Sequence, residues 1–361
     1  MVNVLIHPVG TACNLSCEYC FYRHVRNAPP SRSFMSEETF SCLMNNFSFI
    51  TNDDEKKVID LIWHGGEPLL RGYSFYDHVA DLSQYVLPKN LEIHQCLQTN
   101  GTMIDKRWAS LFKKRKILVG VSIDGTQRMH DMFRRGHSRP SFAESFRGLQ
   151  ILQDADVPNG IVTVVHRGNV SHPDEVFEFL QESGSPHMQL SACFECGSAD
   201  DFSVTPEEYS RFVCRLFDLW IAAGDPDVTI AFIDEIVNFF LGKEVSDCLL
   251  GDQCDKFVVL DWDGTIRTCS GLGNCGMLPL GNIHTDSLPN ILGNTSGIEL
   301  YCSIHKQRLS VCSPCEWYGL CHGGCPYHWL AGQAPSALCL GYRQIFEHIG
   351  NTLLKCSGGS V

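Results

Sequence analysis

The sequence predicts an α/β protein with a parallel sheet, curled into a partial (β/α)6 barrel of the TIM type and followed by a cysteine-rich extension. Two observations support this fold class. Short apolar, β-branched runs alternate with helix-like segments through the first two-thirds of the chain, as in parallel strands joined by right-handed crossovers. Cysteine and glycine then become frequent, which indicates a region held together by bound metal.

Six apolar runs are predicted to be the barrel strands: Val2–His7, Val58–Trp63, Leu91–Leu97, Ile117–Ile123, Gly160–Val165 and His187–Ala192. Helix-start signals lie between them, at Ser36-Glu37-Glu38, Asp105-Lys106-Arg107 and His172-Pro173-Asp174-Glu175. These runs and signals define a barrel region over residues 1–204.

The pattern changes after the barrel region. Thr205-Pro206-Glu207-Glu208 starts a helix that is predicted to reach about Ala223, and a second helix follows over Phe232–Leu241. Beyond Cys248 the sequence has one hairpin signal, at residues 258–266. We therefore expect a helical connection over residues 205–245 and a cysteine-rich domain with a C-terminal helix over residues 246–361.

Composition limits the possible partners and compartments. The 361 residues carry a formal net charge of -13, which argues against nucleic acid as a partner because its phosphates require an excess of Lys and Arg. We expect no membrane partner, because no apolar run approaches the ~18 residues of a span and no signal peptide is evident. Nineteen cysteines without export indicate metal ligation in a reducing compartment, the cytoplasm.

Three cysteines follow the first predicted strand with the spacing C-x3-C-x2-C: Cys13, Cys17 and Cys20. Three thiolates can hold three irons of a 4Fe-4S cube and leave the fourth iron open to a ligand. Zinc is the alternative, although closed zinc sites normally have four protein ligands. The carboxyl end of a strand is also where β/α folds build their active sites.

Further motifs identify a family resemblance. Phe21 and Tyr22 follow the last of these cysteines, and the second strand ends in His64-Gly65-Gly66-Glu67-Pro68. With these features the chain resembles the radical S-adenosylmethionine (radical SAM) superfamily and its GGEP motif. The resemblance implies that backbone groups at Gly65 and Gly66, supported by the Glu67 carboxylate, bind the methionine amine of S-adenosylmethionine (SAM).

Residues at the next strand ends match the same superfamily. By resemblance, Asn100 lines the SAM pocket, and Ser122 with Arg134 holds the methionine carboxylate. Each residue also has an ordinary structural interpretation. Asn-Gly is a turn, Ser caps helices, and an Arg pair is often a solvated face. Their joint placement at successive strand ends favours the cofactor interpretation.

The C-terminal cysteines resemble the SPASM extension of radical SAM enzymes, which carries two auxiliary 4Fe-4S clusters. The resemblance assigns one set of four ligands to each cluster: Cys248, Cys254, Cys269 and Cys325 to the first, and Cys312, Cys315, Cys321 and Cys339 to the second. A pair of zinc sites is the alternative, since C-x2-C suits either metal. Eight ligands fill two cubes, and the upstream domain requires electron delivery, so iron–sulfur is favoured.

Two further motifs are not assigned a function. Gly271–Gly276 matches G-x-G-x-x-G, but no strand–helix unit surrounds it, so nucleotide binding is not predicted. Cys193-Phe194-Glu195-Cys196 matches a redox C-x-x-C without the thioredoxin-like order of elements. Ordinary free thiols are the expectation there, and Cys275 has no assigned role.

Over nearly its whole length the chain looks most like the anaerobic sulfatase-maturating enzymes, which oxidise a Cys or Ser of a sulfatase to formylglycine. In those enzymes an Asp, the presumed base, follows the third ligand of the first auxiliary cluster, but this chain has Ser270. Serine is a poor base without an activating partner. Four nearby acids are candidate substitutes, although spacing does not show which points inward: Asp252, Asp255, Asp261 and Asp263.

The departure at Ser270 favours a related peptide maturase that acts on a ribosomally made precursor peptide, oxidising or cross-linking a residue through a 5′-deoxyadenosyl radical. Sulfatase maturation is the close alternative. Tyr22 and His64, which flank the cofactor motifs, are candidates for substrate contact. A flavodoxin or ferredoxin is the expected electron donor, and no separate leader-peptide domain is expected before Cys13. A non-catalytic scaffold with zinc in all the cysteine sites is the alternative from another class.

Overall fold

A computed structural model describes residues 3–24, 34–47, 57–86, 90–136, 139–194, 202–250, 254–271, 279–294, 299–329 and 336–356. Contacts divide the chain into two units, which are described separately. The first contains Met1–Val121, Arg135–Asn159 and Cys254–Cys302, and the second contains Ser122–Arg134, Gly160–Gln253 and Ser303–Val361. These units are not the three regions expected from the sequence, and those regional boundaries stay a prediction.

The first unit contains seven strands in the order β10-β9-β8-β1-β2-β3-β4. Strands β1 to β4 pair in parallel, and β8 pairs in parallel with β1. β9 and β10 add antiparallel edges. The strands are β1 (Asn3–His7), β2 (Lys57–Trp63), β3 (Leu91–Thr99), β4 (Leu118–Ser122), β8 (Phe257–Asp261), β9 (Thr265–Arg267) and β10 (Gly281–Asn282).

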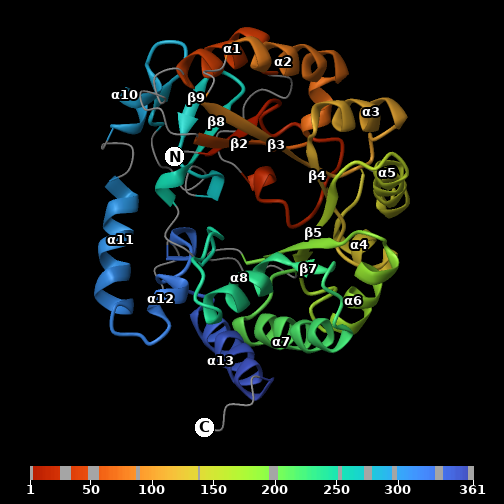
Figure 1. Ribbon diagram of the computed structural model, residues 1–361, viewed down its shortest axis with the longest axis vertical. Helices are drawn as coiled ribbons and strands as arrows, with labels where there is room; N and C mark the ends of the chain where they lie inside the picture. The colour runs from red at the N-terminus through yellow and green to blue at the C-terminus, as the bar shows by residue number, and fades with distance from the viewer. Residues whose placement is uncertain are drawn as a thin grey trace. The chain divides into compact units, whose positions relative to one another are not determined.

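Helices α1 and α2 lie side by side in this unit (Figure 1). Trp63 is fully buried there, with its indole ring stacked on Phe40 and edge-on to Tyr76. The helical segments of the first unit are η1 (Phe21–His24), α1 (Glu37–Asn46), η3 (Pro68–Arg71), α2 (Tyr73–Val86), α3 (Lys106–Arg115), α5 (Phe142–Asp154), η4 (Cys254–Lys256) and α10 (Leu288–Leu292).

In the second unit the strands run in the order β5-β6-β7, and α7 packs beside α13 (Figure 1). Gly341 of α13 permits that approach, because a Cβ there would lie 2.4 Å from the Pro206 carbonyl oxygen. The elements are β5 (Asn159–Val165), β6 (His187–Ala192), β7 (Thr229–Ile230), α4 (Gln127–Phe133), α6 (Pro173–Glu182), α7 (Pro206–Ala223), α8 (Ala231–Phe240), α11 (Glu299–Cys312), α12 (Tyr318–Cys321), η6 (Pro326–Trp329) and α13 (Cys339–Cys356).

All six predicted strands are present within two residues of their expected ends, and the predicted hairpin is β8–β9. The expected helix starts are also confirmed. Thr205 forms a capping box with Glu208 at α7, and Asp105 caps α3 through the Trp108 amide. The pairing of β8 with β1 was not foreseen from the sequence. Among the described helices, none is long and apolar enough to cross a membrane.

Candidate functional site

The three cysteines of the C-x3-C-x2-C motif lie in the irregular segment between β1 and η1. Cys17 is buried, while Cys13 and Cys20 are half-buried. Backbone contacts hold the segment in place. The Ser16 amide donates to the Arg135 carbonyl at 2.7 Å, and the Cys20 amide donates to the Cys17 carbonyl at 3.2 Å. The three thiols therefore belong to one ordered loop, which we call the cysteine loop (residues 10–20).

The GGEP turn packs directly against the cysteine loop. The Gly66 amide donates to the Gly10 carbonyl at 2.9 Å, and the Glu67 amide donates to the Ala12 carbonyl at 2.8 Å. A Cβ on Gly66 would lie 2.1 Å from the Ala12 carbonyl oxygen, which is a severe clash. Gly65 has φ +99°, a conformation that favours glycine. Glycine at these two positions is thus required for the turn to contact the loop.

Glu67 is fully buried and ties the same turn to the end of β3. Its carboxylate accepts hydrogen bonds from the Thr99 hydroxyl at 2.8 Å and from the Asn100 amide at 2.8 Å. It also accepts from the Leu69 amide at 3.0 Å. These bonds make Glu67 a positioning residue for the turn. Its predicted contact with the methionine amine is untested.

Asn100 is the residue at which this network returns to the cysteine loop. Its side-chain amide donates to the Asn14 side-chain oxygen at 2.8 Å and lies 3.8 Å from the Cys13 sulfur. Burial is the main reason that the pKa of the Cys13 thiol rises to about 12, and the Glu67 carboxylate adds to it. A buried thiol of this kind ionises when a cationic centre takes it as a thiolate ligand. The cysteine loop therefore has the donor atoms and the environment that suit an iron–sulfur cluster.

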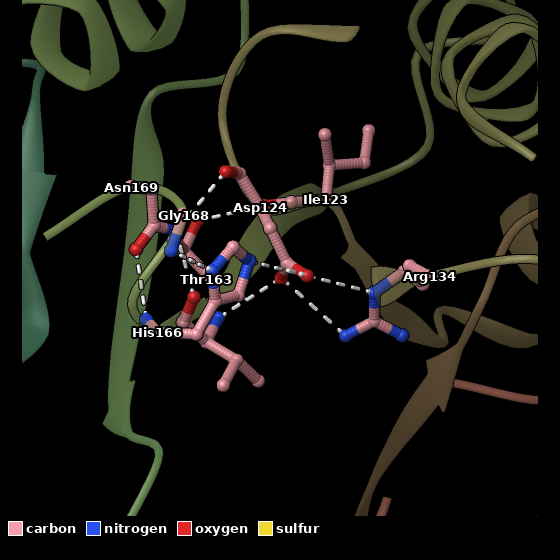
Figure 2. Close-up of polar contacts among 8 residues, drawn as sticks. Ile123, Asp124, Arg134, Thr163, His166, Gly168 and Asn169 are labelled. Carbon is pink, nitrogen blue, oxygen red and sulfur yellow. Dashed lines mark hydrogen bonds and ion pairs between the residues drawn. The ribbon is translucent and has the colours of Figure 1, made fainter. Parts of the chain in front are cut away.

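Arg134 lies in the second unit and forms an ion pair with Asp124 (Figure 2). Its Nε donates to Asp124 Oδ2 at 3.2 Å. Asp124 is fully buried, accepts from the Val164 amide at 3.0 Å and lies 3.6 Å from His166 Nε2. The neighbouring Arg134 and His166 hold the pKa of Asp124 well below its usual range despite burial. Asp124 thus fixes the guanidinium of Arg134, a role that the sequence reasoning missed.

Ser122 is the last residue of β4 and belongs to the same unit as Arg134. Their predicted contact with the methionine carboxylate stays a prediction, as does the lining role of Asn100.

Four C-terminal cysteines line one cavity of the second unit: Cys312, Cys315, Cys321 and Cys339. They are the set expected for the second auxiliary cluster. Aromatic side chains, including Trp317 and Phe346, complete the wall. Among the described residues no three His, Cys, Asp or Glu side chains are grouped for a single metal ion.

The other auxiliary set is divided between the units, with Cys254 and Cys269 in the first and Cys248 and Cys325 in the second. Its ligand assignment therefore stays a prediction. Cys193 is buried at the end of β6. Cys196, Cys275, Asp252 and most of the G-x-G-x-x-G segment lie outside the described residues.

The three candidates for substrate chemistry meet around a histidine that the sequence analysis did not single out. His7 Nε2 lies 3.1 Å from the Tyr22 hydroxyl and 3.2 Å from the Ser270 hydroxyl, and its Nδ1 lies 3.2 Å from Asp261 Oδ1. The Tyr22 hydroxyl also lies 3.1 Å from His64 Nδ1. We call these five residues the His7 network. All five lie within the first unit.

Strand register explains how the His7 network forms. His7 ends β1, Asp261 ends β8, and the two residues are direct partners in the parallel pairing of these strands. Of the two candidate acids whose side chains the structure describes, Asp261 reaches Ser270 through an imidazole. Asp263, by contrast, is exposed and accepts from the Thr265 amide. The sequence signal for this pair is that His7 and Asp261 each end a strand. It can be recognised only when β1 and β8 are known to be paired.

Comparison with known proteins agrees with this geometry. The sequence profile of the Radical SAM superfamily matches residues 7–180, which include the cysteine loop, the GGEP turn, Asn100 and Arg134. The chain is therefore a radical SAM enzyme, with SAM and a radical SAM 4Fe-4S cluster as its cofactors. The superfamily resemblance expected from the motifs is confirmed.

Within that superfamily the chain is related to the anaerobic sulfatase maturases. It is 28% identical to the serine-type anaerobic sulfatase-maturating enzyme of Bacteroides thetaiotaomicron, over 96% of this chain and 89% of that protein. A cysteine-type enzyme of Clostridium perfringens (strain ATCC 13124) is also 28% identical, over 96% of both chains.

Solved structures extend the relation to the fold. The structure of native anSMEcpe with bound AdoMet and Cp18Cys peptide superposes with a TM-score of 0.85, at 26% identity over 99% of both chains. This likeness confirms the predicted fold class. Streptococcus suis SuiB bound to the precursor peptide SuiA has a TM-score of 0.63 at 13% identity, over 93% of this chain and 74% of that chain, and shares the fold alone.

Proposed function

We propose that the protein is a peptide maturase, which abstracts hydrogen from a residue of a ribosomally made peptide or protein. One observation carries this proposal: a cysteine loop held by the GGEP turn and Asn100, in a chain related over 96% of its length to a sulfatase-maturating enzyme. When bound, the cluster and SAM supply a 5′-deoxyadenosyl radical. The protein's own contribution is to hold the reacting groups and to exclude water.

Each predicted ligand has a place in this scheme. Cys13, Cys17 and Cys20 would hold the catalytic cluster, and three ligands would leave its fourth iron to SAM. Gly65, Gly66 and Asn100 would line the methionine end of SAM. The fork of Arg134, already oriented by Asp124, would pair with the methionine carboxylate alongside Ser122.

Electron delivery is the second part of the proposal. The cavity lined by Cys312, Cys315, Cys321 and Cys339 would hold one auxiliary 4Fe-4S cluster. Cys248, Cys254, Cys269 and Cys325 would hold the other. A reduced flavodoxin or ferredoxin in the cytoplasm is the expected donor. Fully protein-ligated clusters suit electron transfer, because they offer no open coordination position.

Two substrate classes remain in view. Ser270 in place of the maturase Asp favours a precursor peptide. Near-complete coverage of the maturases favours the second candidate, conversion of Cys or Ser to formylglycine in a sulfatase. Both candidates begin with the loss of one hydrogen atom from a peptide side chain, so one assay can compare them.

The test is anaerobic turnover of three synthetic peptides, followed by mass spectrometry. One spans a sulfatase maturation site with Cys at the target, the second has Ser there, and the third is a short peptide encoded beside this gene. We expect 5′-deoxyadenosine together with a mass loss in at least one peptide. Two hydrogens lost from the third peptide would support the precursor class. A formylglycine product would support sulfatase maturation.

Absence of 5′-deoxyadenosine from iron-loaded protein would contradict the proposal altogether. The competing zinc scaffold makes the opposite prediction, since zinc sites are colourless and cleave no SAM. Absorbance near ~400 nm after anaerobic reconstitution separates the two, because iron–sulfur clusters absorb there and zinc does not.

A further inference from the structure

We infer that His7, oriented by Asp261, is the general base of the reaction and takes the substrate proton through the Ser270 hydroxyl. The inference rests on the proposed function and names the proton acceptor of that same site. The site needs a base other than Ser270, because a serine is a poor base by itself.

Hydrogen bonding assigns the protons in the His7 network. The Gly65 amide donates to His64 Nδ1 at 2.7 Å, so that nitrogen is an acceptor. The Tyr22 hydroxyl lies 3.1 Å from both His64 Nδ1 and His7 Nε2. Burial, followed by His7, lowers the pKa of His64 to about 3, so this imidazole stays neutral.

His7 presents Nε2 to the hydroxyls of both Tyr22 and Ser270. Its Nδ1 faces the Asp261 carboxylate at 3.2 Å, which places the imidazole proton on Nδ1 and the lone pair on Nε2. The Ser270 hydroxyl at 3.2 Å donates to that lone pair. The Asp261 carboxylate, the His7 imidazole and the Ser270 hydroxyl thus form a hydrogen-bonded triad like the one that activates serine in hydrolases.

The carboxylate is itself held in place. Arg267 Nε donates to Asp261 Oδ2, while Oδ1 faces His7. Burial alone would raise the pKa of Asp261, but the hydrogen bonds and electrostatic interactions with His7 and Arg267 lower it. His7 is 6% exposed and Ser270 is half-buried, so the Ser270 hydroxyl is more accessible to a substrate than the His7 imidazole. Asp261 and Arg267 are therefore positioning residues.

The step balances for a side chain that carries a carbon-bound hydrogen beside a thiol or hydroxyl. The hydrogen on carbon leaves as an atom and forms 5′-deoxyadenosine. The heteroatom proton passes to Ser270 as the Ser270 proton passes to His7 Nε2. The remaining electron would go to an oxidised auxiliary iron–sulfur cluster. One C–H and one heteroatom–H bond break, and a double bond forms between carbon and the heteroatom.

The test compares His7→Gln and the double variant His7→Gln/Ser270→Asp with the parent enzyme on the three peptides named above. Glutamine keeps hydrogen bonds to Asp261 and Ser270 but is not a base. We expect H7Q to retain its iron and to form 5′-deoxyadenosine, while product per 5′-deoxyadenosine falls about 100-fold. Asp at position 270 accepts the proton directly, so the double variant should recover at least about tenfold.

A matched control is His94→Gln on β3, where the imidazole is half-exposed and lies near Asp60 and Glu92. It should behave like the parent enzyme. An unchanged ratio of product to 5′-deoxyadenosine in H7Q would overturn the inference and leave the proposed function standing. Failure of Ser270→Asp to improve H7Q would also overturn it, because His7 would then act through structure alone. A parent enzyme that forms 5′-deoxyadenosine but converts none of the peptides would contradict both.

Discussion

At the scale of single residues, the contact between Gly66 and the cysteine loop leaves no room for a side chain. Two backbone hydrogen bonds join the GGEP turn to the loop, and they require the closest approach at Gly66. Loop geometry therefore depends on the absence of one methyl group, and cluster binding depends on loop geometry.

Gly66→Ala should consequently lose the catalytic cluster. The added Cβ would meet backbone atoms of Ala12, which cannot move aside as a flexible side chain could. We expect about four fewer irons per chain after anaerobic reconstitution, since one 4Fe-4S cluster is lost, together with loss of 5′-deoxyadenosine formation. The control is Gly136→Ala, which has no positive φ and where the nearest atoms, those of Arg139, would lie 3.6 Å from the new Cβ in ordinary van der Waals contact. A Gly66→Ala protein with parental iron content would contradict this account of the turn.

At the scale of elements, local patterns were sufficient for the strands and the cysteine loop. Each predicted strand is a short stretch in which apolar residues recur, and the loop ligands lie within eight residues of one another. The pairing of β1 with β8 joins residues 254 positions apart and has no local signal. The role of His7 was therefore invisible in the sequence, although Tyr22, His64 and Ser270 were recognised individually.

The Asp124–Arg134 pair was also not predicted from the sequence, although its two residues are only ten positions apart. Arg134 was recognised by its motif, but its partner was not, because turns and helix α4 separate the two residues. A buried ion pair is costly to break, since the remaining charge stays without compensation.

Asp124→Asn should therefore destabilise the protein by about 3–5 kcal/mol at neutral pH. It leaves the buried Arg134 guanidinium without its carboxylate. The measurement is the urea midpoint of the holoprotein under anaerobic conditions. Asp174→Asn is the matched control, because its pair with Arg215 is about half-exposed on both sides, and such pairs contribute little. Equal midpoints for the two variants would show that the buried pair does not stabilise the fold.

At the scale of the whole molecule, the account assigns separate tasks to separate groups of cysteines. The cysteine loop belongs to the first unit, and the cavity with Cys321 belongs to the second. Cleavage of SAM and relay of the product electron should therefore be separable by mutation.

Cys321→Ala should lose iron equivalent to one 4Fe-4S cluster, about four irons, and convert less peptide, while it retains cleavage of SAM. Burial raises the pKa of the Cys321 thiol to about 11, which a cluster would offset by binding the thiolate. Cys214→Ala, at a half-buried position of α7 with no predicted ligand role, should keep all of its iron. If both variants keep the same iron content, the second auxiliary site is not where we place it.

The central claim is that Cys13, Cys17 and Cys20 hold the cluster that cleaves SAM. The most direct measurement is 5′-deoxyadenosine formed from SAM and dithionite by the anaerobically reconstituted enzyme and by its Cys13→Ala/Cys17→Ala/Cys20→Ala variant. The account predicts formation by the parent enzyme and none above background by the triple variant, which keeps the iron of both auxiliary clusters. Formation at the parent rate by the triple variant would contradict it.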